Sequence, residues 1–139
     1  MTIKSGDSEL SIADILVGEV WVCGGQSNMA WTMRGSTNAD IEISAANFPE
    51  IRFLKLPNVA SPRALDDFPL GKPTDWIGKW QKAVTPEVQN CSAVAYYFAR
   101  RLHRQLKVPV GIIENSWGGT MAQHWCNKNT LKQIPEMAE

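Results

Sequence analysis

Hydrophobic and polar positions along the 139-residue chain predict several strands. Two nearly continuous apolar runs, ILVGEVWVC from Ile15 to Cys23 and VGIIE from Val110 to Glu114, are typical of strands buried in a parallel sheet. Residues 51–56 alternate apolar and polar side chains, which predicts a further strand. Residues 2–4 and 8–12 flank a glycine and an aspartate, so a short hairpin is expected there. Strand-forming segments therefore recur over most of the chain.

Two other segments have the pattern of helices. In residues 92–106, apolar positions recur at a helical spacing and form one stripe. The opposite side is basic near its C-terminal end, which suits a solvated face and the helix dipole. A shorter helix is expected to begin at Thr37 or Asn38 and to end near Asn47. The stripe of the longer helix consists of Val94, Ala95, Phe98, Ala99, Leu102 and Leu106.

The segment 57–79 is rich in proline and glycine, which predicts a long surface loop. Trp76 and Trp80 are expected to pack this loop against the body of the protein. The order of strand, helix, strand, loop, helix and strand predicts an α/β fold with parallel strands and right-handed crossovers. The length of the chain allows one modest domain.

Composition excludes some classes of partner. Lys plus Arg (14) equal Asp plus Glu (14), so no basic face is implied and nucleic acid is not expected as a partner. Three cysteines without a CxxC pair and two histidines form no recognisable zinc pattern, so no metal is expected. Cys23 is expected to be a small core residue. Most of the six tryptophans are also expected to lie in the core. No apolar run is long enough to suggest a membrane span.

Two glycine-containing segments follow the two apolar runs and carry the candidate chemistry. Ser27 comes shortly after Gly24 and Gly25, and Gly118 and Gly119 follow the second run. Because open α/β sheets bind ligands at the carboxyl ends of their strands, both segments are expected at one edge of the sheet. An exposed serine hydroxyl and free backbone N–H groups there would provide the nucleophile and the oxyanion hole that acyl transfer requires.

A structural role for Ser27 is the alternative. A serine at a strand-to-helix junction is also a good helix N-cap, and paired glycines are ordinary turn residues. The segment lacks the Gly-x-Ser-x-Gly pattern of the α/β-hydrolase elbow, because Met29 occupies the last position. The pattern alone leaves capping and catalysis both open.

Three blocks of sequence resemble one known family, in the correct order. They are GEVWVCGGQSNM at 18–29, SAVAYYFAR at 92–100 and VPVGIIENSWGGT at 108–120. These blocks are similar to landmarks of the sialate O-acetylesterase family, which belongs to the SGNH hydrolases. The resemblance implies the N-terminal part of the catalytic domain only. The implied fold is a partial SGNH-hydrolase fold, a flavodoxin-like three-layer α/β sandwich with a parallel sheet.

The resemblance also implies roles for individual residues. Ser27 would be the catalytic nucleophile, and its own backbone N–H would be one oxyanion donor. Gly118 or Gly119 would supply a second N–H to the same oxyanion hole. No metal or organic cofactor is implied. The residues that would shape the loop and contact the substrate are Gln26, Asn28 and Trp31.

The resemblance further indicates what this sequence lacks. The family takes a third oxyanion contact from a later Gln-Gly-Glu block and its base from a later Asp-x-x-His block, and neither block occurs here. His124 does not match the family's histidine and is interpreted as a packed or surface residue. Residues 1–13 are interpreted as the end of a preceding β-rich region, and residues 14–139 as an incomplete SGNH-type esterase domain. Without a base, the chain is expected to be inactive alone.

The implied reaction is the removal of O-acetyl groups from sugars through an acyl-enzyme, with an O-acetylated carbohydrate as substrate. An acetylxylan-type carbohydrate esterase is one alternative, and nothing in the residues separates the two sugars. A non-catalytic sugar- or partner-binding fragment is another.

An uncovered apolar sheet edge is also expected, which would bind a missing C-terminal complement or cause self-association. The compartment is not assigned, and the periplasm, the extracellular space and the lysosome are open for the parent protein. In the alternative of a sugar- or partner-binding fragment, the side chains that would stack on the ligand are those of Trp31, Trp76, Trp80 and Trp117.

Overall fold

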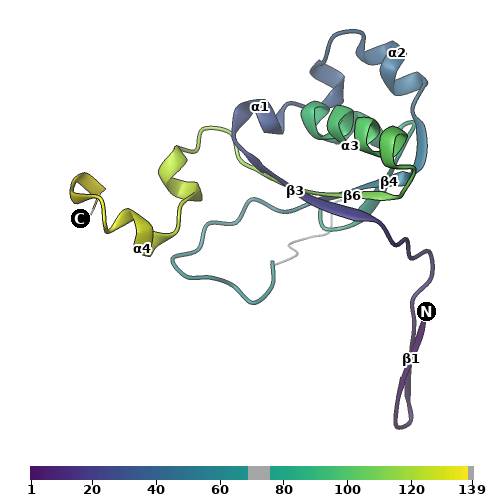
Figure 1. The fold of residues 1–139 in the computed structure, drawn as a ribbon, viewed down its shortest axis with the longest axis horizontal. Coiled ribbons are helices and arrows are strands. Elements are labelled where there is room, and N and C mark those ends of the chain that lie inside the picture. Colours follow the sequence, from purple (N-terminus) through teal and green to yellow (C-terminus); the bar gives the residue numbers. More distant parts are fainter. Residues whose placement is uncertain (69–75, 138–139) are drawn as a thin grey trace.

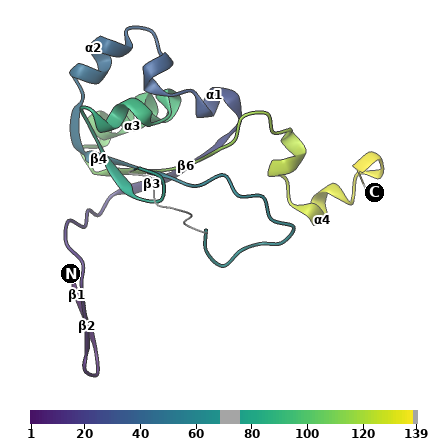
Figure 2. The same cartoon turned by 180° about the vertical axis from the view of Figure 1, so that it is seen from behind.

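A computed structural model of the chain describes residues 1–68 and 76–137. At the N-terminus, β1 (Thr2–Ser5) and β2 (Ser8–Ser11) pair in antiparallel register, which confirms the predicted hairpin. Gly6 in its turn has a φ of +56°, a backbone conformation that glycine adopts without steric cost. The hairpin extends away from the rest of the protein in both views (Figures 1 and 2).

The main sheet has four strands in the order β3-β6-β4-β5. These are β3 (Glu19–Gly25), β6 (Val110–Ser116), β4 (Asn47–Lys55) and β5 (Trp80–Val84). The central strand β6 is parallel to both β3 and β4, whereas β5 is antiparallel to β4, so the sheet is mixed rather than wholly parallel. Sequence analysis missed β5, because this short strand follows the proline-rich segment and lacks a continuous apolar run.

Helices lie over one face of this sheet, and the segment that follows β4 runs on the other side (Figures 1 and 2). The helices on that face are α1 (Ser27–Ala30), α2 (Ala39–Ser44) and α3 (Ala93–Leu106). This arrangement confirms the predicted α/β fold, with parallel pairing of β3, β6 and β4. None of the helices in the described ranges is long and apolar enough to cross a membrane. The shorter elements are η1 (Met33–Gly35), η2 (Glu87–Asn90), η3 (Ala122–Trp125), α4 (Lys128–Leu131) and η4 (Pro135–Met137).

Helix α3 begins as predicted, since the Ser92 side chain accepts a hydrogen bond from the Ala95 N–H at 3.2 Å. The face that it buries differs from the predicted stripe. Small residues and Tyr96 face the core, whereas Val94 is 51% exposed. Phe98 instead contacts Trp21 of β3, with ring centroids 5.2 Å apart. Because alanines allow a close approach to the sheet, they occupy the buried side and displace the larger residues from it.

The basic side of α3 is also less solvated than expected. Arg100 forms an ion pair with Glu42 of α2 at 2.5 Å, and its guanidinium lies over the rings of Tyr96 and Tyr97. His103 Nδ1 donates a hydrogen bond to the Val108 carbonyl at 2.8 Å, and the side chain is half-buried. Helix α2 is shorter than predicted, and α3 holds it through these side chains.

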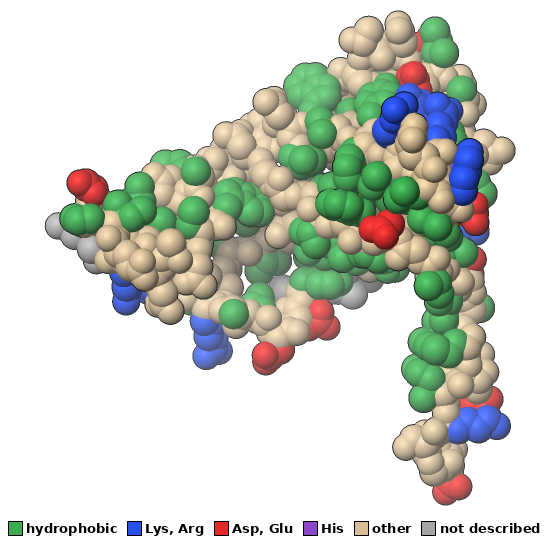
Figure 3. Space-filling model, in the orientation of Figure 1, with side chains coloured by type: hydrophobic (Ala, Val, Ile, Leu, Met, Phe, Trp, Pro, Cys, Tyr) green, Lys and Arg blue, Asp and Glu red, His purple; other side chains and the backbone are tan. Residues whose placement is uncertain are grey.

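The two apolar runs have different surroundings. Strand β6 is central and buries alternate residues on the helix side, as expected. Strand β3 lies at one edge of the sheet, so the prediction that it is buried is wrong: Val20 is 62% exposed and Val22 is 68% exposed. Hydrophobic side chains accordingly gather over the region of α3 and β3 in Figure 3. The core position predicted for Cys23 is confirmed.

Candidate active site

Ser27 is the first residue of α1, at the carboxyl end of β3. The strand ends at Gly25, whose φ of +150° is rarely adopted by other residues and whose added Cβ would lie 3.2 Å from the Met29 Cβ. The chain therefore turns tightly from strand into helix at this point. Ser27 is exposed, and its hydroxyl makes no hydrogen bond within residues 1–68 and 76–137. The hydroxyl is thus free to meet a substrate.

The glycine turn after β6 lies beside Ser27. The Trp117 N–H donates to the Gly25 carbonyl at 2.9 Å, which joins the turn to the end of β3. A Cβ on Gly118 would lie 3.5 Å from Ser27 Oγ. Gly119 has a φ of +81° and nothing within 4 Å of its Cβ position, so glycine is favoured there by the turn conformation. The structure therefore brings Ser27 and Gly118 together, as the sequence predicts.

The hydrogen bonds of the predicted oxyanion donors differ. Within the described part of the chain, the Gly118 and Gly119 N–H groups donate no hydrogen bond. The Ser27 N–H instead donates to Oε1 of Gln26 at 2.7 Å, and Gln26 Nε2 lies 3.5 Å from the Thr120 carbonyl oxygen. An oxyanion would have to displace the Gln26 carboxamide before it could use the Ser27 donor. Gln26 therefore caps α1 in this structure. The sequence predicted only that Gln26 shapes the loop and contacts the substrate.

The other predicted substrate-binding residues lie near the surface. Asn28 is exposed on α1, one position after Ser27. Trp31 is 58% exposed and packs on Gly35, where an added Cβ would come within 2.6 Å of the indole nitrogen. The Trp31 carbonyl accepts a hydrogen bond from the Ala93 N–H at 2.8 Å, which fixes the segment after α1 against the start of α3.

His124 lies in η3, and its Nδ1 accepts a hydrogen bond from the Met121 N–H at 3.1 Å. No hydrogen bond joins His124 to Ser27 in the part of the chain that the structure describes. The neighbouring Trp125 contacts the candidate site. Its ring lies 3.6 Å from the Cβ position of Gly24, and its Nε1 donates to Thr120 Oγ1 at 2.9 Å. Sequence analysis missed this residue because nothing in its local pattern distinguishes it from other tryptophans.

Beneath the site, Glu114 is a buried carboxylate on the central strand and is 2% exposed. Burial raises the pKa of Glu114 above its ordinary value, although the Ser92 N–H and the Lys55 ammonium oppose that rise. Its Oε1 accepts from the Ser92 N–H at 2.8 Å, and its Oε2 lies 3.6 Å from Lys55 Nζ. A charged residue within an apolar strand was the sequence signal for this site, and it was not used.

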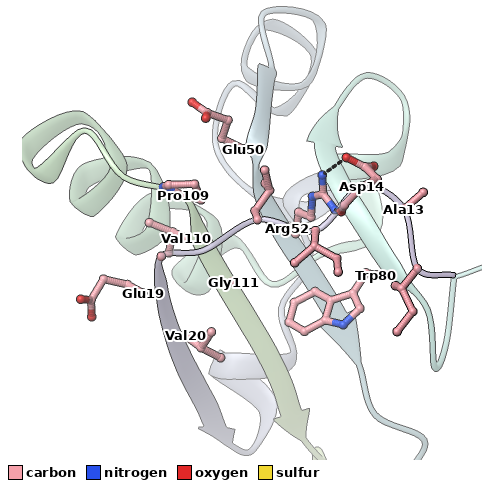
Figure 4. A pocket seen from close by; sticks show the side chains of 14 residues that line it. Ala13, Asp14, Glu19, Val20, Glu50, Arg52, Trp80, Pro109, Val110 and Gly111 are labelled. Atoms are coloured by element: carbon pink, nitrogen blue, oxygen red, sulfur yellow. Dashed lines mark hydrogen bonds and ion pairs between the residues drawn. The ribbon is translucent and has the colours of Figure 1, made fainter. Parts of the chain in front are cut away.

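A cavity of about 480 Å³ lies at the opposite, amino-terminal ends of the strands (Figure 4). Trp80 and Val110 line it together with aliphatic residues of segment 12–18. Asp14 lies at its edge in a hydrogen bond to Arg52 at 2.7 Å, drawn in Figure 4, and this contact and Lys82 lower the pKa of Asp14. Ser27 does not line this cavity. Within the described residues, no three His, Cys, Asp or Glu side chains lie close enough to bind a metal ion together.

Comparison with known proteins identifies relatives of the whole segment. The chain is 33% identical over 137 residues to the sialate O-acetylesterase of Mus musculus and 32% identical to that of Homo sapiens, matches that cover 94% of this chain. The chain is a partial member of the sialate O-acetylesterase family. It spans about a quarter of the length of these curated relatives, 24% and 25% respectively. No protein-family model matches the chain.

A solved structure supports the same assignment. A carbohydrate acetylesterase from Xanthomonas citri superimposes with a TM-score of 0.86 at 29% sequence identity. The superposition covers 96% of this chain and 29% of that protein. The fold and the order of elements in this partial family member are therefore those of part of a carbohydrate acetylesterase.

Proposed function

We propose that this chain is the nucleophile-bearing part of a carbohydrate O-acetylesterase. Ser27 Oγ attacks the carbonyl carbon of an acetyl ester, its proton passes to a base, and the sugar hydroxyl leaves as the acyl-enzyme forms. Water then attacks the acyl-enzyme and releases acetate and free Ser27. The observation that carries this proposal is the 3.5 Å between Ser27 Oγ and the Cβ position of Gly118, in a relative of sialate O-acetylesterases.

The oxyanion hole in this proposal uses backbone N–H groups from both strand ends. The N–H of Gly118, with Gly119 next to it, has no partner in the described part of the chain and supplies one donor. The Ser27 N–H supplies the other once the substrate oxygen replaces Gln26 Oε1. Such donors act best about 3 Å from the developing charge, in a site from which water is excluded. Asn28 and Trp31 contact the sugar side of the substrate.

The base is not among the residues that match the family. His124 is bonded to Met121 through Nδ1, and the sequence has no Asp-x-x-His block. We therefore propose that the base comes from outside these 139 residues, in a complementary polypeptide segment. A serine without its base retains only the contributions of binding and the oxyanion hole. The division into residues 1–13 and 14–139 also stays a prediction.

Labelling with a fluorophosphonate tests this function, because the probe phosphonylates an activated serine. We expect mass spectrometry of the labelled chain to find the adduct on Ser27, at a rate that added imidazole increases. The Gly118→Val variant should lose the adduct, since its side chain would fill the space in front of Ser27 Oγ. Labelling spread over surface serines, or unchanged in Ser27→Ala, would refute the assignment.

An acetylxylan-type substrate remains the alternative within the same reaction. The alternative of a non-catalytic sugar-binding fragment draws on tryptophan exposure, since Trp31, Trp80 and Trp117 are at least 38% exposed and Trp76 is half-buried. The expectation that most tryptophans lie in the core is therefore wrong. Trp80, however, lines the cavity at the amino ends of the strands, whereas Trp117 follows the carboxyl end of β6. They do not form a single stacking platform, which favours the esterase proposal.

A further inference from the structure

Glu114 is a buried charge that the proposed chemistry does not use. It is 2% exposed and lies on β6, the central strand. A buried carboxylate is costly unless it is paired and hydrogen-bonded, and breaking such a pair on one side is more costly still. Each oxygen of Glu114 has one partner: Oε1 the Ser92 N–H at 2.8 Å, and Oε2 Lys55 Nζ at 3.6 Å. These two partners lead to the two halves of the candidate site.

The Ser92 contact leads to the element that carries Ser27. The residues on either side of Ser92 hold the segment that follows α1, through hydrogen bonds from Ala93 N–H to the Trp31 carbonyl at 2.8 Å and from Met33 N–H to the Cys91 carbonyl at 3.0 Å. Ser92 Oγ also lies 3.6 Å from the sulfur of Met29, which is inside α1. Glu114 therefore fixes the start of α3, against which α1 is placed.

The Lys55 contact leads to the glycine turn. Lys55 Nζ donates to Ser116 Oγ at 3.0 Å, and Ser116 lies two residues before Gly118 at the end of β6. Ser116 is paired in register with Gly25, and the next N–H, that of Trp117, donates to the Gly25 carbonyl at 2.9 Å. Lys55 is thus held by Glu114 on one side and holds the base of the turn on the other.

We infer that Glu114 and Lys55 are positioning residues, which set the placement of Ser27 relative to the Gly118 N–H through Ser92 and Ser116. Neither side chain touches the reacting atoms. The inference rests on the proposed function in assuming that Ser27 and Gly118 form one site, but the placement itself is measured without any reaction. Buried ion pairs add little net stability, and in some proteins they specify conformation instead.

The deciding variant replaces both residues, Lys55→Met with Glu114→Met. Exchanging a buried ion pair for apolar side chains of similar size is often neutral or stabilising for the fold. The Ser92 N–H also loses its acceptor, so we expect the chain to remain folded with a somewhat lower urea midpoint of unfolding. Phosphonylation of Ser27 should slow by roughly tenfold or more, as a misplacement of about 1 Å produces in catalytic sites. Hydrogen exchange of the Trp117 N–H should rise by roughly tenfold, since its bond to Gly25 loosens.

Two further variants separate the halves of the network. Glu114→Gln keeps an acceptor for Ser92 but removes the charge that holds Lys55, so exchange should rise at Trp117 and stay unchanged at Ala93. Lys82→Met is the matched control, because it also removes one lysine of the sheet but one paired with Asp14 at 3.3 Å, and it should change neither readout. Lys55→Arg should keep the rate of Ser27 labelling within roughly threefold of the wild-type rate, because the guanidinium can still donate to both Glu114 and Ser116.

A folded double variant that labels Ser27 at the wild-type rate and keeps wild-type exchange at Trp117 would overturn the inference. If the double variant does not fold, Glu114→Gln with unchanged exchange at Trp117 overturns it equally. Absence of Ser27 labelling in the wild type would instead contradict the proposed function, and the exchange measurements would still decide whether the ion pair positions the turn.

Discussion

Strands β6 and β3 both contain apolar runs but have very different surroundings. Each is seven residues long and ends in a segment of the candidate site. In β6 the helix-facing residues, such as Ile112 at 0% exposure, are fully buried, whereas Val20 and Val22 of β3 remain mostly exposed. Strand β6 is paired with a strand on both sides and packed by α3, whereas among the described residues β3 is paired with a strand on one side only. An apolar run therefore indicates which strand can be buried on both faces, and the neighbours decide whether it is.

The largest effect is expected from matched truncations in the two strands. Ile112→Ala should lower the free energy of unfolding by about 2–5 kcal/mol, because it leaves a cavity in the core. Val22→Ala should change it by about 0.5 kcal/mol or less, as is usual for exposed positions. Urea denaturation of both variants measures the difference. Equal losses would show that β3 is covered in solution, and the contrast between the strands would then be incorrect.

Self-association through the β3 edge is the next expectation. An uncovered strand edge with apolar side chains is a template for pairing with another strand. We expect sedimentation of the purified chain to show concentration-dependent association and a dye for apolar surface to bind. Val22→Lys should weaken association by roughly tenfold, because a lysine at an edge strand opposes pairing. A monomer that binds no dye at all concentrations would contradict this expectation.

A smaller, pH-dependent effect distinguishes the two carboxylates on opposite ends of the sheet. Burial raises the folded-state pKa of Glu114 above its ordinary value of 4.5. Between the pKa of the unfolded chain and that of the folded chain, the folded chain therefore binds more protons than the unfolded chain. The stability of the wild type relative to Glu114→Gln should therefore increase as pH falls from about 7 towards that ordinary value. Unfolding curves over this range measure the trend.

Asp14 supplies the opposite sign. Hydrogen bonds from Arg52 and Lys82 lower its pKa below the ordinary value of 3.8. Its stabilising contribution is present above that value and is lost as pH falls below it through the folded-state pKa. The stability of the wild type relative to Asp14→Asn should therefore decrease in that acidic range. Trends of the same sign for both carboxylates would show that Glu114 is not buried as described.

The smallest effect concerns hydrolysis by the chain alone. Because no matching base is present, Ser27→Ala should change the slow hydrolysis of an aryl acetate very little. The assay needs only the purified chain and the variant. If the wild type turned over the ester at rates typical of enzymes, and His124→Ala abolished them, the interpretation of His124 as uninvolved would be wrong.

Much of the fold was predictable from local patterns. The hairpin, both apolar strands, β4 and α3 each have a periodicity or turn signal of their own. What the sequence did not show was which strand lies at the edge, because strand order depends on long-range pairing. The stripe of α3 was misassigned for a related reason: the helix turns its alanines to the sheet and leaves Val94 outside.

The candidate site shows the same division. Ser27 and Gly118 were expected side by side, because each follows a strand at the same edge of the sheet, and the structure brings them together. The contact of Gln26 with the Ser27 N–H was not predictable, since it depends on the conformation of one side chain. The partners of Glu114 come from segments up to 59 positions away, such as Lys55, and only the folded chain shows them.

The most direct test of the central claim is hydrolysis of an aryl acetate with imidazole added as an external base. The account predicts a saturable rate above that of imidazole alone, which is lost in Ser27→Ala and in Gly118→Val, because it needs both the hydroxyl and the free space beside it. Gly119→Ala crowds no neighbouring atom within 4 Å but strains the turn, because Gly119 has a φ of +81°, so a loss of rate there would report the turn conformation rather than lost space. A rate that is the same in wild type and Ser27→Ala, with both chains folded, would contradict the claim that Ser27 is the nucleophile.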